Sequence, residues 1–292
     1  MDQCVENSAL EMEAQHAKEV SRSSYLEISD RADQVGAIFE RRGVRLHRDS
    51  SLGKILRAAN HLSASWAKGE RSATIHDILA AAQANRVAEA VIAAAGEPSA
   101  LESLRRISGN PMDLMGRALS QGKDHLWELE LWAILRKRGV SAELRDPPDI
   151  VAEVADFAVP IACKKVYSEK GVEAQIRKGV KQIEAHGTGG LVGLNIDDLL
   201  PADSILKQRD YASASAWLGG FAAEFIERNR IKLQRPIAQG RCDGILVSAT
   251  CVCDLDEGAP RFTTVTDTTV WSLQTLKLEA SARFDALRKA LG

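Results

Sequence analysis

Apolar residues recur at three- and four-residue spacing through the first third of the chain, which is typical of helices with one buried face. This pattern predicts helices at residues 26–42, 52–66, 75–95, 101–107 and 112–119. The third helix is rich in alanine and stops at Gly96 and Pro98. We therefore expect residues 1–120 to form an all-helical N-terminal region.

From about residue 121 the pattern changes to a mixture of helices and short strands. Helices are predicted at 125–139, 171–185, 204–230 and in a last segment that ends at 291. Strands are predicted at 140–146, 149–154, 159–166, 191–196, 244–253 and 261–271. In the third strand Ile161 and Cys163 face one way, while Ala162 and Lys164 face the other. We expect residues 121–292 to form an α/β domain.

The composition restricts the classes of protein to which the chain can belong. Its formal net charge is −2, so a contact with nucleic acid would need a local basic patch. No apolar run approaches the roughly 18–20 residues that span a bilayer, and no secretory signal is recognisable. The five cysteines, an odd number, do not suggest a disulfide scaffold. We expect a protein of the reducing cytoplasm without a membrane partner.

Charged residues around the second and third predicted strands are candidates for phosphodiester chemistry. Asp149 opens one strand after two prolines, Lys164 lies on the next, and Glu128 lies on the helix before them. Carboxylates hold the divalent metal in such a reaction, and a nearby lysine orients or deprotonates the attacking water. Alone, Asp149 would be explained as a turn residue and Lys164 as a solvated strand end. Their order along the predicted elements favours the functional interpretation.

This stretch resembles the PD-(D/E)xK nuclease superfamily, which has the restriction-endonuclease-like fold. The family motif consists of a helix glutamate, Pro-Asp at a strand start, acid-x-Lys on the next strand and often a glutamine on the following helix. The matching residues are Glu128, Pro148-Asp149, Ala162-Cys163-Lys164 and Gln182. The resemblance covers about residues 122–196 and leaves the N-terminal region unexplained.

The resemblance implies a mixed central sheet flanked by helices, and a metal-dependent endonuclease that acts on DNA in restriction or anti-phage defence. Asp149 and Glu128 would bind Mg²⁺ or Mn²⁺, and Lys164 would activate water. Contacts with the nucleic-acid backbone are expected from Lys165, Arg177, Lys178, Lys181 and Gln182. The choice between DNA and RNA stays open.

Ala162 occupies the position at which the family motif has a carboxylate, and an alanine side chain binds no metal. Three explanations stay open: a deliberate inactivating substitution, migration of the acid to Glu184 or to a glutamate of the first helix, or natural loss of the site in a domain that only binds. Glu153 is a poor replacement, because four strand residues separate it from Asp149 by roughly 13 Å.

Other candidate residues have simpler explanations. Glu130 competes with Glu128, but the two point about 200° apart on a helix, so only one of them faces the site. Cys251 and Cys253 share the apolar face of a predicted strand, so packing explains them better than zinc does. His125 has no partner at metal-ligand spacing and is expected to be an ordinary surface or turn residue.

Two other classes of function are alternatives to a nuclease. A non-catalytic nucleic-acid-binding or regulatory subunit would use the same fold and would bind DNA without a metal. An interaction protein would instead act through residues 1–120. In a nuclease, this helical region would form a homodimer, recognise a target or dock a partner protein.

Overall fold

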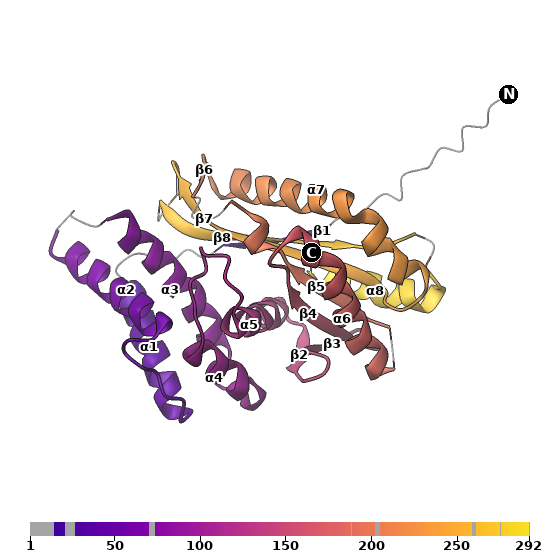
Figure 1. Cartoon of the computed structure of the whole chain (residues 1–292), viewed down its shortest axis with the longest axis horizontal. Coiled ribbons are helices and arrows are strands. Elements are labelled where there is room, and N and C mark those ends of the chain that lie inside the picture. The colour runs from indigo at the N-terminus through magenta and orange to yellow at the C-terminus, as the bar shows by residue number, and fades with distance from the viewer. Residues whose placement is uncertain are drawn as a thin grey trace.

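The computed structural model describes residues 15–20, 27–69, 74–187, 189–201, 205–258, 261–274 and 276–291, the first of these segments by its backbone alone. The described residues form eight α-helices around one mixed β-sheet (Figure 1). Within these segments, no helix is both long and apolar enough to cross a membrane. The predicted mixture of helices and strands is confirmed.

The sheet follows the strand order β1-β8-β7-β5-β4-β3-β2, and β6 pairs with β7 outside this path. The central strands β4, β5 and β7 are parallel, whereas the pairs towards both ends of the path are antiparallel. The strands are β1 (Gln15–Val20), β2 (Ser141–Leu144), β3 (Ile150–Val154), β4 (Phe157–Lys165), β5 (Leu191–Asn195), β6 (Leu206–Gln208), β7 (Gly244–Leu255) and β8 (Phe262–Trp271).

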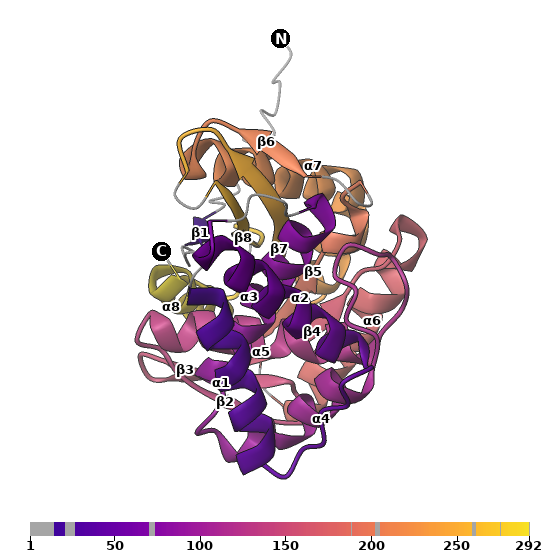
Figure 2. The same cartoon turned by 90° about the vertical axis from the view of Figure 1, so that its left-hand side faces the viewer.

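Two groups of helices cover opposite faces of the sheet. One face packs against α6 (Val172–His186) and α7 (Tyr211–Ala238). The other face packs against α5 (Gln121–Lys137) and α8 (Leu278–Leu291). Figure 2 shows the N-terminal helices in front of the strands on the side of α5. These helices are α1 (Glu27–Arg41), α2 (Ser51–Ala67), α3 (Ile75–Ala93) and α4 (Leu101–Gly109).

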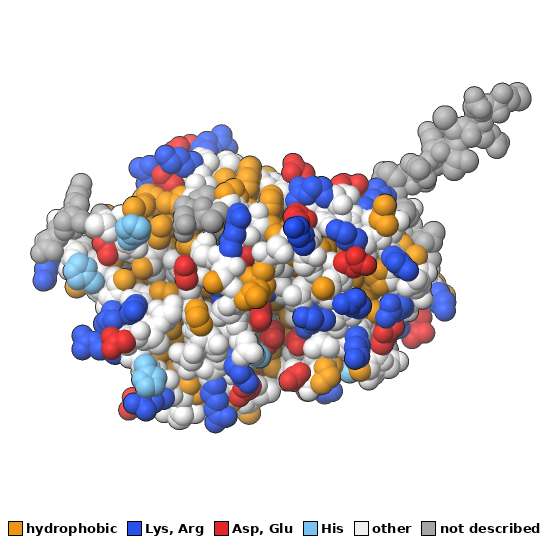
Figure 3. Space-filling model, in the orientation of Figure 1, with side chains coloured by type: hydrophobic (Ala, Val, Ile, Leu, Met, Phe, Trp, Pro, Cys, Tyr) orange, Lys and Arg blue, Asp and Glu red, His pale blue; other side chains and the backbone are white. Residues whose placement is uncertain are grey.

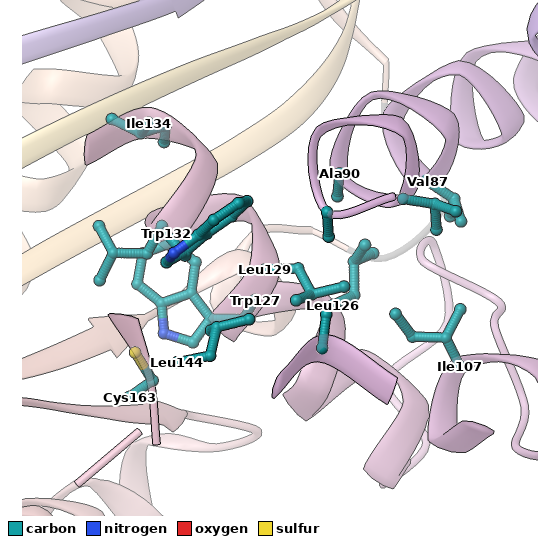
Figure 4. Packing of buried hydrophobic residues seen from close by; sticks show 14 of the residues in the cluster. Val87, Ala90, Ile107, Leu126, Trp127, Leu129, Trp132, Ile134, Leu144 and Cys163 are labelled. Atoms are coloured by element: carbon teal, nitrogen blue, oxygen red, sulfur yellow. The ribbon is translucent and has the colours of Figure 1, made fainter. Parts of the chain in front are cut away.

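The N-terminal helices share a hydrophobic core with the α/β region. Val87 and Ala90 of α3 lie in the same buried cluster as Leu126 and Leu129 of α5 (Figure 4). In addition, β1 forms an antiparallel pair with β8, although no strand was expected in this part of the chain. The division into two domains near residue 121 stays a prediction, but the two regions are packed together through apolar side chains.

Two predicted helices differ from the structure. Residues 112–119 are not helical, because their backbone groups bond to side chains of the helical region. The backbone N of Met112 donates to Ser51 Oγ and that of Leu114 donates to Gln83 Oε1, both at 2.9 Å. The helix expected at 204–230 begins at Tyr211 after a capping box and extends to Ala238.

Candidate functional site

Asp149 is the centre of a cluster of polar side chains at one end of β3 and β4. It directly precedes β3 and is buried, with 7% of the residue exposed. Its Oδ2 accepts hydrogen bonds from the backbone N of Cys163 at 2.6 Å and from Nζ of Lys164 at 2.8 Å. Its Oδ1 accepts a hydrogen bond from Nε2 of Gln182 at 3.3 Å. Donors from β4 and α6 therefore hold this carboxylate in one orientation.

The ammonium group of Lys164 is bound on two sides. Besides its ion pair with Asp149, Nζ donates to the carbonyl oxygen of Cys163 at 2.7 Å. The side chain of Lys164 is 14% exposed, so solvent reaches the cluster at this point. The predicted neighbours Asp149 and Lys164 are therefore in direct contact, at a partly exposed point of the protein.

Glu128 approaches the same cluster from α5. Burial raises the pKa of its carboxyl group, and the charge of Asp149 adds to this effect, while His125 and Lys164 act against it. Nδ1 of His125 lies 2.7 Å from Oε2 of Glu128. Burial disfavours the charged imidazole, but the hydrogen bond and charge of Glu128 raise the pKa of His125 overall. His125, expected to be an ordinary surface or turn residue, instead positions Glu128.

Ala162 lies beside Asp149 in the sheet. The register pairs Ile150 of β3 with Ile161 of β4, so the next pair brings Asp149 alongside Ala162. The methyl group of Ala162 is fully buried in the core between the sheet and α6. A carboxylate at position 162 would therefore point towards α6, the side from which Gln182 reaches Asp149. Ala162 itself contributes only an apolar methyl group on this side of the sheet.

Arg177, Lys178 and Lys181 form an exposed basic surface on α6. None of the three forms an ion pair with another residue that the structure describes. Gln182, on the same helix, is half-buried and turns inward to Asp149. Figure 3 shows lysine and arginine side chains gathered over α6 and the neighbouring part of α7. Positive charge is thus available next to the Asp149 cluster.

Lys165 points away from this surface and into the protein. Its Nζ lies 2.5 Å from Oδ1 of Asn195, 2.7 Å from Oδ2 of Asp198 and 3.7 Å from Oδ2 of Asp197. Successive residues of a strand face opposite sides, so Lys164 and Lys165 serve different clusters. This placement does not favour the expected contact between Lys165 and nucleic acid, because the ammonium group is buried beside two carboxylates.

A buried cluster of charges joins the N-terminal helices to the sheet. Arg86 of α3 donates to Glu130 of α5 at 2.5 and 2.8 Å, and to Asp197 at 2.7 Å. Burial raises the pKa of Glu130 despite the opposing charge of Arg86. Lys123 of α5 donates to Asp198 at 2.8 Å. Glu130 therefore belongs to this cluster. In the sequence, the pair Asp197-Asp198 directly after an apolar strand was the signal that could have indicated the cluster.

The other acids that were considered in place of Ala162 lie elsewhere. Glu184 is exposed and pairs with Arg241 at 2.6 Å, so it does not replace a carboxylate at position 162. Glu153 is exposed on β3. Glu128 is therefore the glutamate that the structure brings to Asp149. Among the described residues, no group of three or more His, Cys, Asp or Glu side chains is arranged to hold a metal ion.

No protein-family model, curated protein or solved structure matches the chain. Support for a function therefore comes from the geometry around Asp149. This site contains a buried carboxylate with three donors, a lysine paired with it, and the carboxyl of Glu128 with a raised pKa. It lies beside an exposed basic surface.

Proposed function

We propose that this protein is a metal-dependent nuclease that cuts DNA and that its sheet is of the restriction-endonuclease-like type. The observation that supports this most strongly is the convergence of residues from separate elements, namely Glu128, Asp149, Lys164 and Gln182. Their order and the elements that carry them are those of the PD-(D/E)xK motif. Two acids, a lysine and an amide brought to one accessible point favour a chemical role, because perturbed ionisable groups concentrate at functional sites.

Asp149 and Glu128 are the carboxylates that would hold a divalent ion at this point. Mg²⁺ is commonly bound by one or two carboxylates together with waters and substrate phosphates. The two residues therefore fit an ion whose coordination the substrate completes, and the ion would supply positive charge against the phosphate. Because Lys164 already pairs with Asp149 and Ala162 offers no ligand, we expect weak metal binding in the absence of DNA.

The other residues of the cluster position the acids and the phosphate. Gln182 restrains Asp149, and His125 restrains Glu128. The ammonium group of Lys164 is placed to orient a water molecule or to stabilise charge on the phosphate. The exposed basic surface of α6 would follow the DNA backbone beside the cluster.

A second function, a non-catalytic DNA-binding or regulatory subunit, is favoured by two observations. Ala162 is fully buried where the motif has its acid, and Lys164 and Asp149 already neutralise each other. Such a protein would bind DNA through α6 with an affinity that falls as the salt concentration rises. It would need no metal.

The test is cleavage of plasmid DNA with Mg²⁺ or Mn²⁺ by the chain itself and by its Ala162→Glu and Ala162→Gln variants. Glutamine matches the size of glutamate without its charge, so it controls for the volume added beside Asp149. We expect Ala162→Glu to cleave at least about 10-fold faster than Ala162→Gln, because even residues that only orient a metal ligand change activity by about 10- to 100-fold. Adding Lys164→Met to Ala162→Glu should abolish the gain. If the Ala162→Glu variant is folded but does not cut DNA in the presence of either Mg²⁺ or Mn²⁺, the nuclease proposal is refuted.

DNA binding separates the two functions. Lys178→Ala and Lys181→Ala should each reduce the salt dependence of binding by about one unit of the logarithmic slope. Arg45→Ala changes an exposed arginine between α1 and α2 and should leave the slope unchanged. Binding in EDTA without cleavage by any variant would identify the second function. If no protein of the series binds DNA, both functions are refuted and an interaction protein is favoured.

A further inference from the structure

Two cysteines touch each other on β7, on the side of the sheet that α7 covers. Cys251 and Cys253 share this side because they are two residues apart on a strand, and their Sγ atoms lie 3.4 Å apart. Both thiols are free. This part of β7 pairs with β6 and β8, whereas Asp149 precedes β3, which β4 and β5 separate from β7. The pair is therefore distinct from the candidate nuclease site.

The two cysteines differ in exposure. Cys253 is fully buried in the hydrophobic core, as expected of a cysteine that only packs. Cys251 is half-buried and lines a small cavity of about 30 Å³. A volume of roughly 10–15 Å³ already holds one water molecule, so the cavity has room for a single ion. An ion that enters it meets Sγ of Cys251 first, and Sγ of Cys253 lies 3.4 Å further into the protein.

The lining of the cavity offers sulfur more readily than oxygen. Met115, which lies between α4 and α5, brings a thioether to the same cavity. The lining also contains two carboxylates, but both are already paired with cations. Asp197 pairs with Arg86 at 2.7 Å. Asp198 pairs with Lys123 at 2.8 Å. This arrangement favours a soft metal ion, for which thiolate and thioether sulfur are the preferred ligands.

The geometry of the pair is less suitable for redox chemistry. The contact with Cys253 and burial raise the pKa of the Cys251 thiol well above its ordinary value, whereas reactive cysteines have a lowered pKa. Residues two apart on a strand have Cα atoms roughly 6.6–6.8 Å apart, which is the upper limit for a disulfide. A disulfide would therefore distort β7, which is hydrogen-bonded to β6 and β8 at this point.

The number of ligands separates one soft ion from another. Structural Zn²⁺ sites use four ligands. Among the residues that the structure describes, no third His, Cys, Asp or Glu joins the two cysteines. Cu(I) is selected by thiolate and thioether ligands and needs only two or three of them. The pair with Met115 nearby therefore fits Cu(I) better than Zn²⁺.

We propose that Cys251 and Cys253 bind one Cu(I) ion, with Met115 as a third sulfur ligand on the side of the cavity. Each thiol that binds the ion releases one proton to the solvent and forms a sulfur–copper bond, and no electron is transferred. Two bonds of about 2.3 Å, the length of a zinc–sulfur bond, span up to about 4.6 Å. Sulfur atoms 3.4 Å apart are therefore close enough to share one ion. This site would operate whether or not the Asp149 cluster cuts DNA.

The test is a titration of the reduced full chain with Cu(I) in the absence of oxygen, with a coloured Cu(I) chelator as competitor. We expect one ion per chain. Cys251→Ala and Cys253→Ala should each weaken binding at least about 100-fold, because residues that only orient a metal ligand already change affinity by about 10- to 100-fold. Met115→Leu preserves an apolar side chain of similar size and should weaken binding by a smaller factor. Unchanged affinity of Met115→Leu would overturn the assignment of the third ligand.

Cys242→Ala is the matched control, because Cys242 is also free and buried but does not line the cavity. It should bind Cu(I) like the unmodified chain. Circular dichroism establishes that each variant is folded. X-ray absorption at the copper edge of the loaded, unmodified chain should show sulfur ligands, and this measurement does not depend on any variant.

Three results would overturn the proposal. The first is a copper ligand shell of nitrogen and oxygen alone. The second is a folded Cys251→Ala or Cys253→Ala variant that retains the affinity of the unmodified chain. The third is an equal loss of affinity in Cys242→Ala and Cys253→Ala. Cleavage of DNA with Mg²⁺ needs neither thiol, so failure of the nuclease proposal is recognised independently.

Discussion

Replacing Arg86 with methionine removes the cation that two buried carboxylates share. Its guanidinium contacts Glu130 of α5 and Asp197, which follows β5. The side chains of Arg86, Glu130 and Asp197 are 11%, 15% and 6% exposed. Methionine preserves much of the apolar stem of arginine. The substitution therefore tests the charge that joins the N-terminal helices to the sheet, with little change in packing.

The two carboxylates are affected unequally by this change. Asp197 keeps a hydrogen bond from the backbone N of Thr250 at 2.7 Å and has Lys165 at 3.7 Å, whereas Glu130 loses its ion-pair partner. Removing one partner of a buried ion pair costs about 3–5 kcal/mol. Because one carboxylate and not two is left unpaired, we expect the free energy of unfolding to fall by about 3 kcal/mol at neutral to alkaline pH.

The loss should depend on pH in a defined direction. Burial already raises the pKa of Glu130, and without Arg86 that pKa rises further. A carboxyl group with a raised pKa in the folded state destabilises the fold above its unfolded pKa and ceases to do so as pH falls and the group protonates. The cost of Arg86→Met should therefore be smaller at about pH 5 than at about pH 8.

Urea unfolding followed by circular dichroism measures this cost. We expect Arg86→Met combined with Glu130→Gln to be more stable than Arg86→Met alone, because no buried charge is left unpaired at that position. Arg105→Met is the control: Arg105 is 57% exposed on α4, and its loss should change stability by less than about 0.5 kcal/mol. A loss below about 1 kcal/mol that does not vary with pH would refute the explanation.

Two further predictions concern the site. The pKa of His125, measured by NMR, should lie above the ordinary value for histidine in the unmodified chain. In Glu128→Gln it should lie below that value, because burial still acts and the charge of Glu128 is gone. The same His125 pKa in both proteins would contradict the contact with Glu128. The stabilisation from His125 should be complete below its unfolded pKa and lost as pH rises through its folded pKa. Gly179→Ala places a Cβ 2.7 Å from Cγ1 of Val192 and should cost about 1–3 kcal/mol on thermal unfolding. Gly220→Ala is the control, because at Gly220 of α7 a Cβ meets nothing within 4 Å. If Gly179→Ala and Gly220→Ala unfold at the same temperature, the predicted clash between α6 and Val192 is wrong.

The sequence alone determined most helices and strands and the faces of the strand that carries Lys164. Hydrophobic spacing within one element depends on neighbours two to four residues away, and that information is local. For this reason the alternation along the strand already placed Ala162 on the same face as Lys164. The expected proximity of Asp149 and Lys164 agrees with the contact at 2.8 Å.

Only the tertiary structure decided which polar groups are paired. Arg86 meets Glu130 and Asp197 because three segments far apart in the chain pack at one point. Lys165 is buried because Asp198 follows a strand adjacent to its own. A buried charge needs a partner, but the identity of that partner depends on strand register and helix packing, which the spacing within one segment does not encode.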